Sequence, residues 1–528
     1  MTKIDKDIAL VSGPPKDINN TQKIATLIGM SGLLILVLAA FNVNFPHIGI
    51  WLAIALGSIA ASIILYSKGA YGNKQEGIKN DGVWFKSISS RGFWGWIAGI
   101  AMTGFYIVLY FFPALLGLNT ERENGGVIAL FDPLSKALSG NAASQWFVYG
   151  TLYTVAILAF GIKFMWKYRN NRYERLRTFS VMFFQTGFAF IIPELIARLN
   201  SDSFSLPYYD LKNVWPLNYY NFEQYRVDEM INAGNIGLAM LIFGVLSILV
   251  ITPILTYKYG KRWYCSWVCG CGGLAETAGD PFRQLSDKST WAWKMERWMV
   301  HSVVVFVVIM TTAVISTYLG YDSEKYWLTK GAFLIGVVAI LTLLIGLLFA
   351  FRRDELKKDA KIGAIGYFAI ILTMIGIHYS TGNSIFMFEA ETLRSTYGFL
   401  IGSVFSGVIG TGFYPILGNR AWCRFGCPMA AIMGMQQRFF SKFRITTNGS
   451  QCISCGNCST YCEMGIDVKA YAQKGQNIVR SSCVGCGVCS AVCPRGVLKL
   501  ENGEDVGDSR YDSDPITFGN DGVFLNVK

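Results

Sequence analysis

Ten long apolar runs constrain the fold of this chain more than any other feature. Each holds roughly 17–25 residues, the length that an α-helix needs to cross a bilayer. They cover residues 24–41, 48–66, 93–116, 146–164, 179–195, 236–255, 299–318, 332–351, 362–379 and 397–417. The composition agrees, because 52% of the 528 residues are hydrophobic and only 16% are charged. We therefore predict a mainly α, polytopic helical membrane protein with about ten spans.

Lysine and arginine are unevenly distributed between the connecting loops. The loops after the second, fourth, sixth and eighth spans hold 22 of these residues, and the loops after the odd-numbered spans hold 8. Cytoplasmic loops carry the excess of basic residues, so we expect the even-numbered loops and both termini in the cytoplasm. The chain is then a multi-pass protein of a bacterial inner membrane. Its net charge of +12 reflects this orientation and does not indicate a nucleic-acid partner.

Two closely matched cysteine runs follow the last apolar run. Each has the spacing C-x2-C-x2-C-x3-C, and Pro494 closes the second. This is the ligand spacing of a bacterial two-cluster ferredoxin, in which the fourth cysteine of each run binds the other cluster. The spacing predicts a first [4Fe–4S] cluster held by Cys452, Cys455, Cys458 and Cys493. It predicts a second cluster held by Cys483, Cys486, Cys489 and Cys462.

Zinc or disulfides are the alternatives for these eight cysteines, and the paired runs favour clusters over both. Cysteines in metal-ligand spacing also suit a reducing compartment, where disulfides are rare. One position breaks the match between the runs, because Glu463 stands where the second run has Pro494. This difference affects local rigidity and leaves the number of ligands unchanged.

A second set of cysteines lies in two loops between spans. One motif occurs twice, at a constant offset of 158 residues. It consists of Gly-x-Arg followed by an aromatic residue, a cysteine, a second aromatic residue and a second cysteine. Its cysteines are Cys265 and Cys269 in the first loop and Cys423 and Cys427 in the second. A C-x3-C pair on a helix presents both sulfurs on one face. Four thiolates suffice for a further iron–sulfur cluster or another soft metal, and the alternative is free or packing thiols.

Five segments of the chain follow from these features. Residues 1–23 form a cytoplasmic N-terminal tail, and residues 24–440 form the transmembrane domain. This domain includes the two C-x3-C loops, residues 258–298 and 418–440. Residues 441–500 form a small α+β ferredoxin domain, and residues 501–528 form an acidic C-terminal tail that we expect to be flexible or loosely docked.

Two further features lie on the outer side of the predicted membrane. The segment 199–229 is rich in tyrosine and asparagine and is expected at the membrane surface, with a docking surface as the alternative. Glu194 lies inside the fifth span, which makes it a candidate for accepting a quinol proton. Its alternative role is an ion pair with Arg198, four residues further along the chain.

Two C-x3-C loops followed by a double ferredoxin run resemble the membrane-bound polyferredoxins of the NapH/NosR/CcoG type. The resemblance covers roughly residues 236–500, and it departs from the family at Gly270, where the family usually has proline. We find no counterpart of the periplasmic flavin-binding domain of NosR-like members. The resemblance implies electron transfer between the quinone pool, cytoplasmic clusters and a periplasmic acceptor, or the reduction and assembly of metal centres.

The predicted function is electron transfer between a cytoplasmic redox protein or flavoprotein and quinone or another membrane or periplasmic redox centre. The chain would then be a component of an oxidoreductase complex. The alternative is a maturation factor that reduces a metal while a cofactor is assembled, with the C-x3-C loops as its metal-handling site. A transporter driven by electron flow has less support, because few ionisable residues lie inside the spans.

Overall fold

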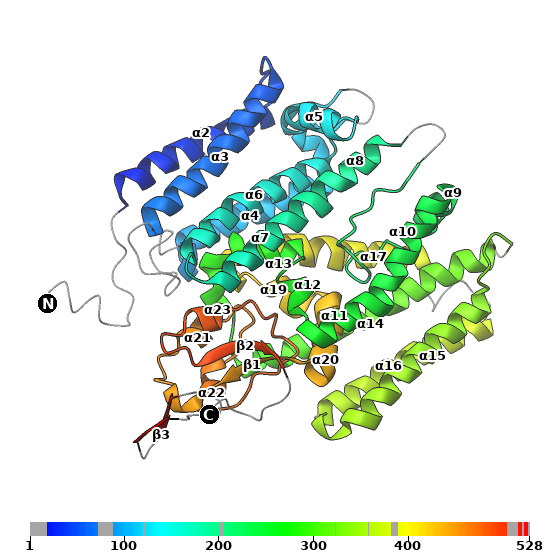
Figure 1. Ribbon diagram of the computed structural model, residues 1–528. Helices are drawn as coiled ribbons and strands as arrows, with labels where there is room; N and C mark the ends of the chain where they lie inside the picture. Colours follow the sequence, from blue (N-terminus) through cyan, green and yellow to red (C-terminus); the bar gives the residue numbers. More distant parts are fainter. Residues whose placement is uncertain are drawn as a thin grey trace.

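The protein is a bundle of long helices that carries a small domain at one end (Figure 1). The structure is a computed structural model and describes residues 18–71, 88–119, 123–200, 205–322, 324–356, 358–381, 389–503, 516–519 and 522–525. Six single helices of the described residues are long enough to span a membrane. They are α2 (Asn20–Ala40), α3 (Ile48–Tyr71), α4 (Phe93–Phe111), α6 (Gln145–Lys167), α14 (Thr290–Tyr321) and α16 (Lys358–Thr381).

Three further spans are compound helices. Two contain a π-helical turn, and the third ends in a 3₁₀ turn. They are α7 (Arg172–Thr186), η3 (Gly187–Ile191) and α8 (Ile192–Arg198); α10 (Asn235–Leu246), η4 (Ser247–Ile251) and α11 (Thr252–Tyr259); and α15 (Lys330–Arg352) with η6 (Arg353–Glu355). Each π turn ends just before a proline, Pro193 or Pro253, which has no N–H to continue a regular ladder.

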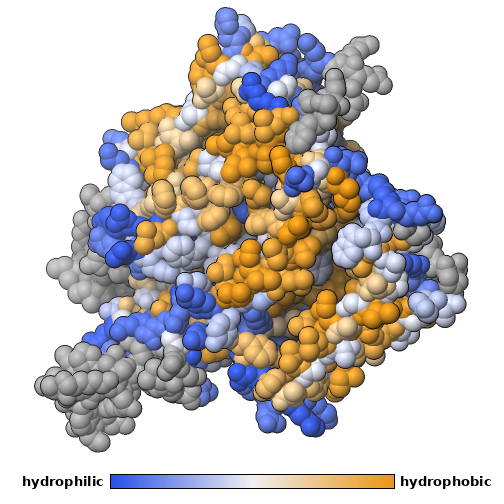
Figure 2. Space-filling model, turned by 45° about the vertical axis from the view of Figure 1, so that its right-hand side comes forward, coloured by the Kyte–Doolittle hydropathy of each residue, from blue (hydrophilic) through white to orange (hydrophobic). Residues whose placement is uncertain are grey.

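Nine helices of the described residues are thus long and apolar enough to cross a membrane. Their exposed side chains form a broad apolar face, which runs across the middle of the molecule in Figure 2. Examples are Ile335, Leu343 and Leu344 on α15, all of them exposed. Apolar side chains in such number are stable at a surface only when lipid covers it. The prediction of a helical membrane protein is confirmed.

The tenth predicted span, residues 397–417, differs from the other nine. Its apolar part is the π-helical segment η7 (Gly398–Ile409), which follows the polar helix α17 (Ala390–Tyr397). A turn after Ile409 then separates η7 from the short helix α18 (Tyr414–Leu417). Helices α17 and η7 follow one another without a break from Ala390 to Ile409, so the tenth run is helical in its apolar part and remains a predicted span beside the other nine.

The remaining helices of the bundle are short. They lie between the spans and include the two cysteine-bearing loops. They are η1 (Ile88–Ser90), η2 (Pro113–Leu116), α5 (Gly126–Leu138), α9 (Gln224–Asn232), α12 (Arg262–Cys265), α13 (Gly270–Thr277), η5 (Asp280–Leu285), α19 (Ala421–Phe425) and α20 (Pro428–Phe440).

A small α+β unit, here called the cysteine domain, follows α20. It begins with strand β1 (Phe443–Thr447) and closes with β2 (Leu498–Asn502), which pair antiparallel with Phe443 opposite Asn502. Between them lie η8 (Gly449–Gln451), α21 (Asn457–Thr460), α22 (Val468–Gln473) and α23 (Val488–Ala491). Pairing of its first and last strands holds the two cysteine runs in one compact unit. The predicted α+β ferredoxin-like domain is confirmed as a cysteine-rich region with a two-stranded sheet.

The two chain ends differ from their predicted description. Helix α2 begins at Asn20, where Asn19 and Gln22 form a capping box, so the tail is shorter than residues 1–23. Residues 1–17 lie outside the described residues. Near the other end, β3 (Ile516–Gly519) pairs antiparallel with β4 (Gly522–Leu525). The predicted acidic tail therefore contains a hairpin, while residues 504–515 are also outside the described part of the chain.

The segment predicted at the outer membrane surface is in part buried inside the bundle and in part exposed. Between α8 and α9 the chain descends among the helices (Figure 1), and Tyr209, Lys212 and Asn221 are buried. The hydroxyl of Tyr264 donates a hydrogen bond to the carbonyl of Lys212 at 2.9 Å. Tyr208 and Tyr220 are exposed, so the expectation of a surface segment fails only for the buried residues, whose polar groups find partners within the protein.

Candidate metal centre

The first predicted ligand set comes together around one hollow of the cysteine domain. This hollow is lined by Cys452, Cys455, Cys458 and Cys493. Cys493 comes from the second run, although it lies 31 residues after its equivalent, Cys462. The four thiols have the number and chemistry that a [4Fe–4S] cluster needs, so the residues present fit this group.

The second predicted set lines a second hollow of the cysteine domain. Its cysteines are Cys462, Cys483, Cys486 and Cys489. Burial raises the pKa of Cys483 to about 11 and that of Cys489 well above its ordinary value. Thiols with raised pKa values are protonated at neutral pH, so ligand binding there must displace protons.

The two hollows differ in their surroundings. The first is rimmed by Ile453, Pro494 and Arg495, which are all exposed. The second is lined by buried residues such as Met464 and Val484. The rim of the first hollow is therefore exposed, whereas the residues around the second are mostly buried.

The loop of the second hollow is hydrogen-bonded to three elements of the membrane bundle. The hydroxyl of Tyr173 on α7 donates to the carbonyl of Gly485 at 2.8 Å. The hydroxyl of Ser266 donates to the carbonyl of Val484 at 2.9 Å, and the amide of Gln437 on α20 donates to the carbonyl of Cys483 at 2.8 Å. These bonds hold the second hollow against the bundle.

The two C-x3-C loops have the same local structure. In each, a glycine with positive φ, Gly260 (66°) or Gly418 (89°), precedes a short helix. The first cysteine lies in that helix, α12 or α19, and the second is the N-cap of the next helix, α13 or α20. The prediction that each pair lies on one helix face was wrong, because the helix breaks between the two cysteines.

Four C-x3-C thiols lie together as a result: Cys265, Cys269, Cys423 and Cys427 are buried in one cluster. The N–H of Ala430 donates to the sulfur of Cys427 at 3.4 Å, and the N–H of Gly272 bonds to Cys269 in the matching position. Helix N-termini carry partial positive charge, which favours thiolates at both N-caps. Burial nevertheless raises the pKa of Cys427 well above its ordinary value, and that of Cys265 to about 12.

Cys271 lies beside this group without belonging to a C-x3-C pair. Its thiol donates a hydrogen bond to Cys269, which lowers the pKa of Cys269, and Lys212 and Arg420 act in the same direction. The ammonium group of Lys212 also donates to the side-chain oxygen of Gln185 at 3.3 Å. The segment that descends from the far end of the bundle therefore brings a cation to the C-x3-C thiols.

A buried ionic network joins the bundle to the cysteine domain. Asp280 accepts a hydrogen bond from Lys167 at 2.8 Å and from Arg283 at 2.9 Å, and all three side chains are fully buried. Lys163 also pairs with Asp280 at 3.7 Å. Burial would raise the pKa of Asp280, but these cations outweigh it and hold the pKa well below its ordinary range.

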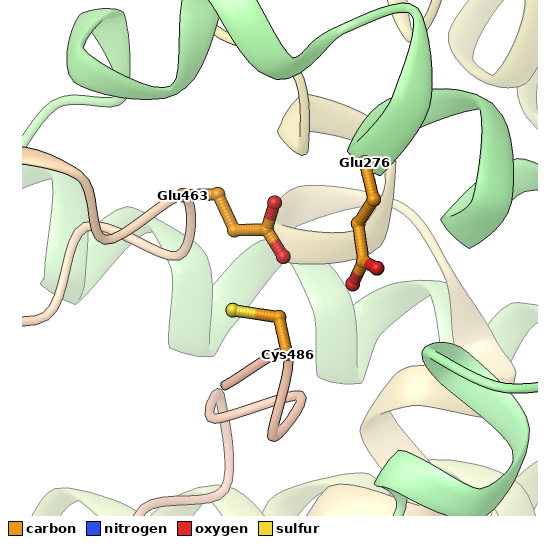
Figure 3. Close-up of side chains that lie close together, drawn as sticks. All are labelled: Glu276, Glu463 and Cys486. Atoms are coloured by element: carbon orange, nitrogen blue, oxygen red, sulfur yellow. The ribbon is translucent and has the colours of Figure 1, made fainter. Parts of the chain in front are cut away.

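Glu276 and Glu463 extend this network to the second hollow. Figure 3 shows both carboxylates directed toward the same space as the sulfur of Cys486, and the three ligand atoms lie within 4.8 Å of one another. Glu276 pairs with Arg177 and Arg420, while Glu463 accepts from Arg283 Nη1 at 2.7 Å. Because both carboxylates already bind arginines, this trio is a charge network and not a metal site.

Glu194 lies apart from the cysteines. It is buried on α8, where its carboxyl group has Tyr208 and Ser139 as neighbours. Arg198, the predicted ionic partner, donates a hydrogen bond to the carbonyl of Ala137 at 2.5 Å. The role of Glu194 in accepting a quinol proton stays a prediction.

The contacts of Arg420, Glu276 and Lys212 were not predicted from the sequence. One signal was present, since Arg420 occupies the arginine position that is repeated in both C-x3-C motifs. The contacts of Glu276 and Lys212 join segments that no spacing rule connects.

Comparisons with known proteins identify both cysteine regions. A family described as a 4Fe-4S dicluster domain matches residues 444–494, and a family described as a 4Fe-4S binding domain matches residues 241–289 and 399–446. The chain is 26% identical over 213 residues to the Escherichia coli (strain K12) protein named "Putative electron transport protein YccM". This alignment covers 40% of the chain and 44% of the relative. No solved structure matches the chain.

The chain is therefore a multi-helix membrane protein with 4Fe-4S binding domains. The predicted iron–sulfur cofactors are confirmed at the level of these domains.

Proposed function

We propose that this chain is a membrane-anchored electron-transfer protein of the NapH/NosR/CcoG type. It would link a cytoplasmic redox protein or flavoprotein to quinone or to another redox centre in the membrane or periplasm. The name of the E. coli relative and the three 4Fe-4S matches support this proposal. When bound, the clusters supply one-electron transfer. The chain positions them, keeps water away and sets the charge around them.

Three sets of thiols hold the clusters in this proposal. The first hollow and the second, buried hollow provide four cysteines each. The C-x3-C thiols provide the third set, and Cys271 is a neighbour and not a ligand. The match of both C-x3-C loops to a 4Fe-4S binding domain favours a cluster there over free thiols.

One observation carries the proposal. All of the thirteen cysteines except Cys455 belong to, or pack against, one buried cluster that joins the cysteine domain to the membrane bundle. A soluble ferredoxin anchored by an unrelated membrane segment would not bury its thiols together with those of two interspan loops. The arrangement fits transfer between the cysteine domain and the membrane.

The unequal hollows suggest which side a redox partner approaches. The first hollow opens beside Ile453, Arg495 and Lys469, which offer an apolar contact flanked by positive charge. A soluble partner with an acidic surface would be favoured there. The second hollow is closed off by the bundle.

The orientation and domain limits are part of the same proposal. Both termini and the cysteine domain lie in the cytoplasm, with residues 24–440 as the membrane domain and 441–500 as the ferredoxin domain. We expect a green fluorescent protein fused after residue 528 to fluoresce. We also expect alkaline phosphatase fused in the loop after α14, near residue 323, to be active. The reverse pattern would refute this orientation.

The metal content tests the proposal directly. We expect anaerobically purified protein to hold about twelve iron and twelve acid-labile sulfide atoms per chain, four for each cluster. Cys423→Ser/Cys427→Ser should lose about four of each and one set of low-temperature paramagnetic resonance signals. Cys271→Ser is the matched control and should lose none. About eight iron atoms in every variant would confine the clusters to the cysteine domain.

Measuring turnover distinguishes an electron-transfer protein from a maturation factor. The electron-transfer proposal predicts repeated turnover of a quinone analogue by the reduced protein. A maturation factor would show no turnover, and the cell would need it only while its client is assembled.

A further inference from the structure

Arg420 contacts both C-x3-C motifs and the cysteine domain with a single guanidinium group. Its Nη1 donates to the sulfur of Cys423 at 3.5 Å and to the carbonyl of Cys265 at 3.3 Å. Its Nη2 pairs with Glu276, and its Nε donates to Glu463 at 3.1 Å. The side chain is 1% exposed. Only the planar fork of arginine presents several donors in fixed directions at once.

Glu463 is the other end of this connection. It directly follows Cys462, a lining residue of the buried hollow, and it is 1% exposed. Besides Arg420, it accepts hydrogen bonds from Arg283 at 2.7 Å and from Asn419 at 3.1 Å. Burial would raise its pKa, but the two arginines outweigh this effect and lower it. A buried ionised carboxylate is stable only with such partners.

The break in the symmetry of the cysteine runs now has a structural reason. At the position of Pro494 the first run has Glu463, and Pro494 rims the first hollow. Glu463 lines the buried hollow and also reaches the bundle through Arg420. The residue that distinguishes the two runs is therefore the one that meets Arg420.

The equivalent arginine of the first motif has different contacts. Arg262 packs over the ring of Phe443 at 4.5 Å and over that of Tyr173 at 5.7 Å. Both arginines contact the cysteine domain, since Arg262 packs on Phe443 and lies against Gly485, but of the two only Arg420 contacts a C-x3-C thiol. Arg262 is thus a matched control of the same residue type and sequence position.

Resting on the proposed function, we propose that Arg420 is the positioning residue that fastens the buried hollow, through Glu463, to the C-x3-C thiols. The cysteine domain then meets the membrane site through its second hollow and not through its first. Arg420 also places a positive charge beside Cys423, and Glu463 places a negative charge beside Cys462 and Cys486.

Arg420 and Glu463 carry opposite charges, so removing each charge should shift a reduction potential in the opposite direction. Removing a positive charge disfavours reduction of the centre beside it, and removing a negative charge favours it. In redox titrations followed by paramagnetic resonance, we expect Arg420→Gln to shift the C-x3-C signal to more negative potential. Glu463→Gln should shift a signal of the cysteine domain to more positive potential. Arg420→Lys, which keeps the charge, should restore most of the first shift, and Arg262→Gln should leave the potential of the C-x3-C signal unchanged.

Partial unfolding cannot shift two reduction potentials in opposite directions, and Arg420→Lys would not reverse it. The result therefore distinguishes a positioning role from a loss of folding. Iron content of each variant shows that the sites are filled. Unchanged potentials in both Gln variants with full iron content would overturn the inference alone. Absence of a C-x3-C signal in the parent protein would instead overturn the proposed function.

Discussion

The side chain of Cys271 changes the acidity of its neighbour Cys269. Its thiol lowers the pKa of Cys269 by hydrogen bonding, so the Cys269 thiolate persists to lower pH than it otherwise would. Cys271→Ala should therefore raise the pKa of one thiol in the metal-free protein. The thiolate absorbance near 240 nm, measured against pH, records this change.

Cys271→Ser is the control for this prediction, because its hydroxyl can still donate to the Cys269 sulfur. Its titration should follow that of the parent. A curve for Cys271→Ala that coincides with both would show that the hydrogen bond has no influence on Cys269.

The second C-x3-C loop depends on the positive φ angle of a single residue, Gly418. Its φ is +89°, and a Cβ there would lie 2.8 Å from the backbone nitrogen of Ser286. Gly418→Ala should destabilise the protein by more than the roughly 1–2 kcal/mol that left-handed backbone costs a non-glycine residue. We expect a lower thermal-unfolding midpoint together with loss of iron at the C-x3-C thiols.

Gly140 is the matched position, since its φ is +81° and no atom lies within 4 Å of an added Cβ. Gly140→Ala should show the backbone cost alone. Equal losses in the two variants would mean that the contact with Ser286 is unimportant.

Among the elements, Asp280 on η5 joins two parts of the bundle. It holds Lys163 and Lys167 of α6 together with Arg283, and removing one partner of such a buried group leaves uncompensated charge. Asp280→Asn should lower the free energy of unfolding by about 3–5 kcal/mol. Denaturant unfolding in detergent, followed by tryptophan fluorescence, measures the loss.

Asp359→Asn is the comparison, because Asp359 pairs with Arg297 at 3.2 Å in an exposed position. Its loss should stay below about 1 kcal/mol. A small effect at Asp280 as well would mean that water or neighbouring groups compensate for the missing carboxylate.

The sequence predicted some elements of the site and missed others for a physical reason. Cysteine spacing is local, and the ligand sets predicted from it line two separate hollows. The helix break between Cys265 and Cys269 was missed, because spacing alone does not show where a helix ends. The pair Arg283–Glu463 joins residues 180 apart, and only tertiary packing brings them together. Lys163, a charge within a predicted apolar run, was the available hint of such a network.

For the whole molecule, the C-x3-C thiols lie where segments from both ends of the bundle meet. Gly270, next to Cys269, lies against Tyr153 near the middle of the α6 span, and Lys212 arrives from the opposite end. Irregular backbone at this depth is stable only when protein surrounds it. The arrangement brings the C-x3-C site within reach of both faces.

Electron transfer across a membrane should follow from this arrangement. Liposomes that contain the iron-loaded protein should reduce enclosed ferricyanide with external dithionite faster than empty liposomes do. Cys423→Ser/Cys427→Ser should lower the rate to that of empty liposomes. An equal rate for parent and variant would show that the C-x3-C thiols are not needed for the crossing.

The ionic network also has a consequence for biosynthesis. Lys163, Arg177, Arg283 and Arg420 leave the ribosome before Glu463, which is made only after the last apolar run. Until then Arg283 and Arg420 lack the carboxylate that they share in the finished protein. A nascent or truncated chain that stops short of this glutamate thus leaves Arg283 with Asp280, and Arg420 with Glu276, as the remaining carboxylate partner.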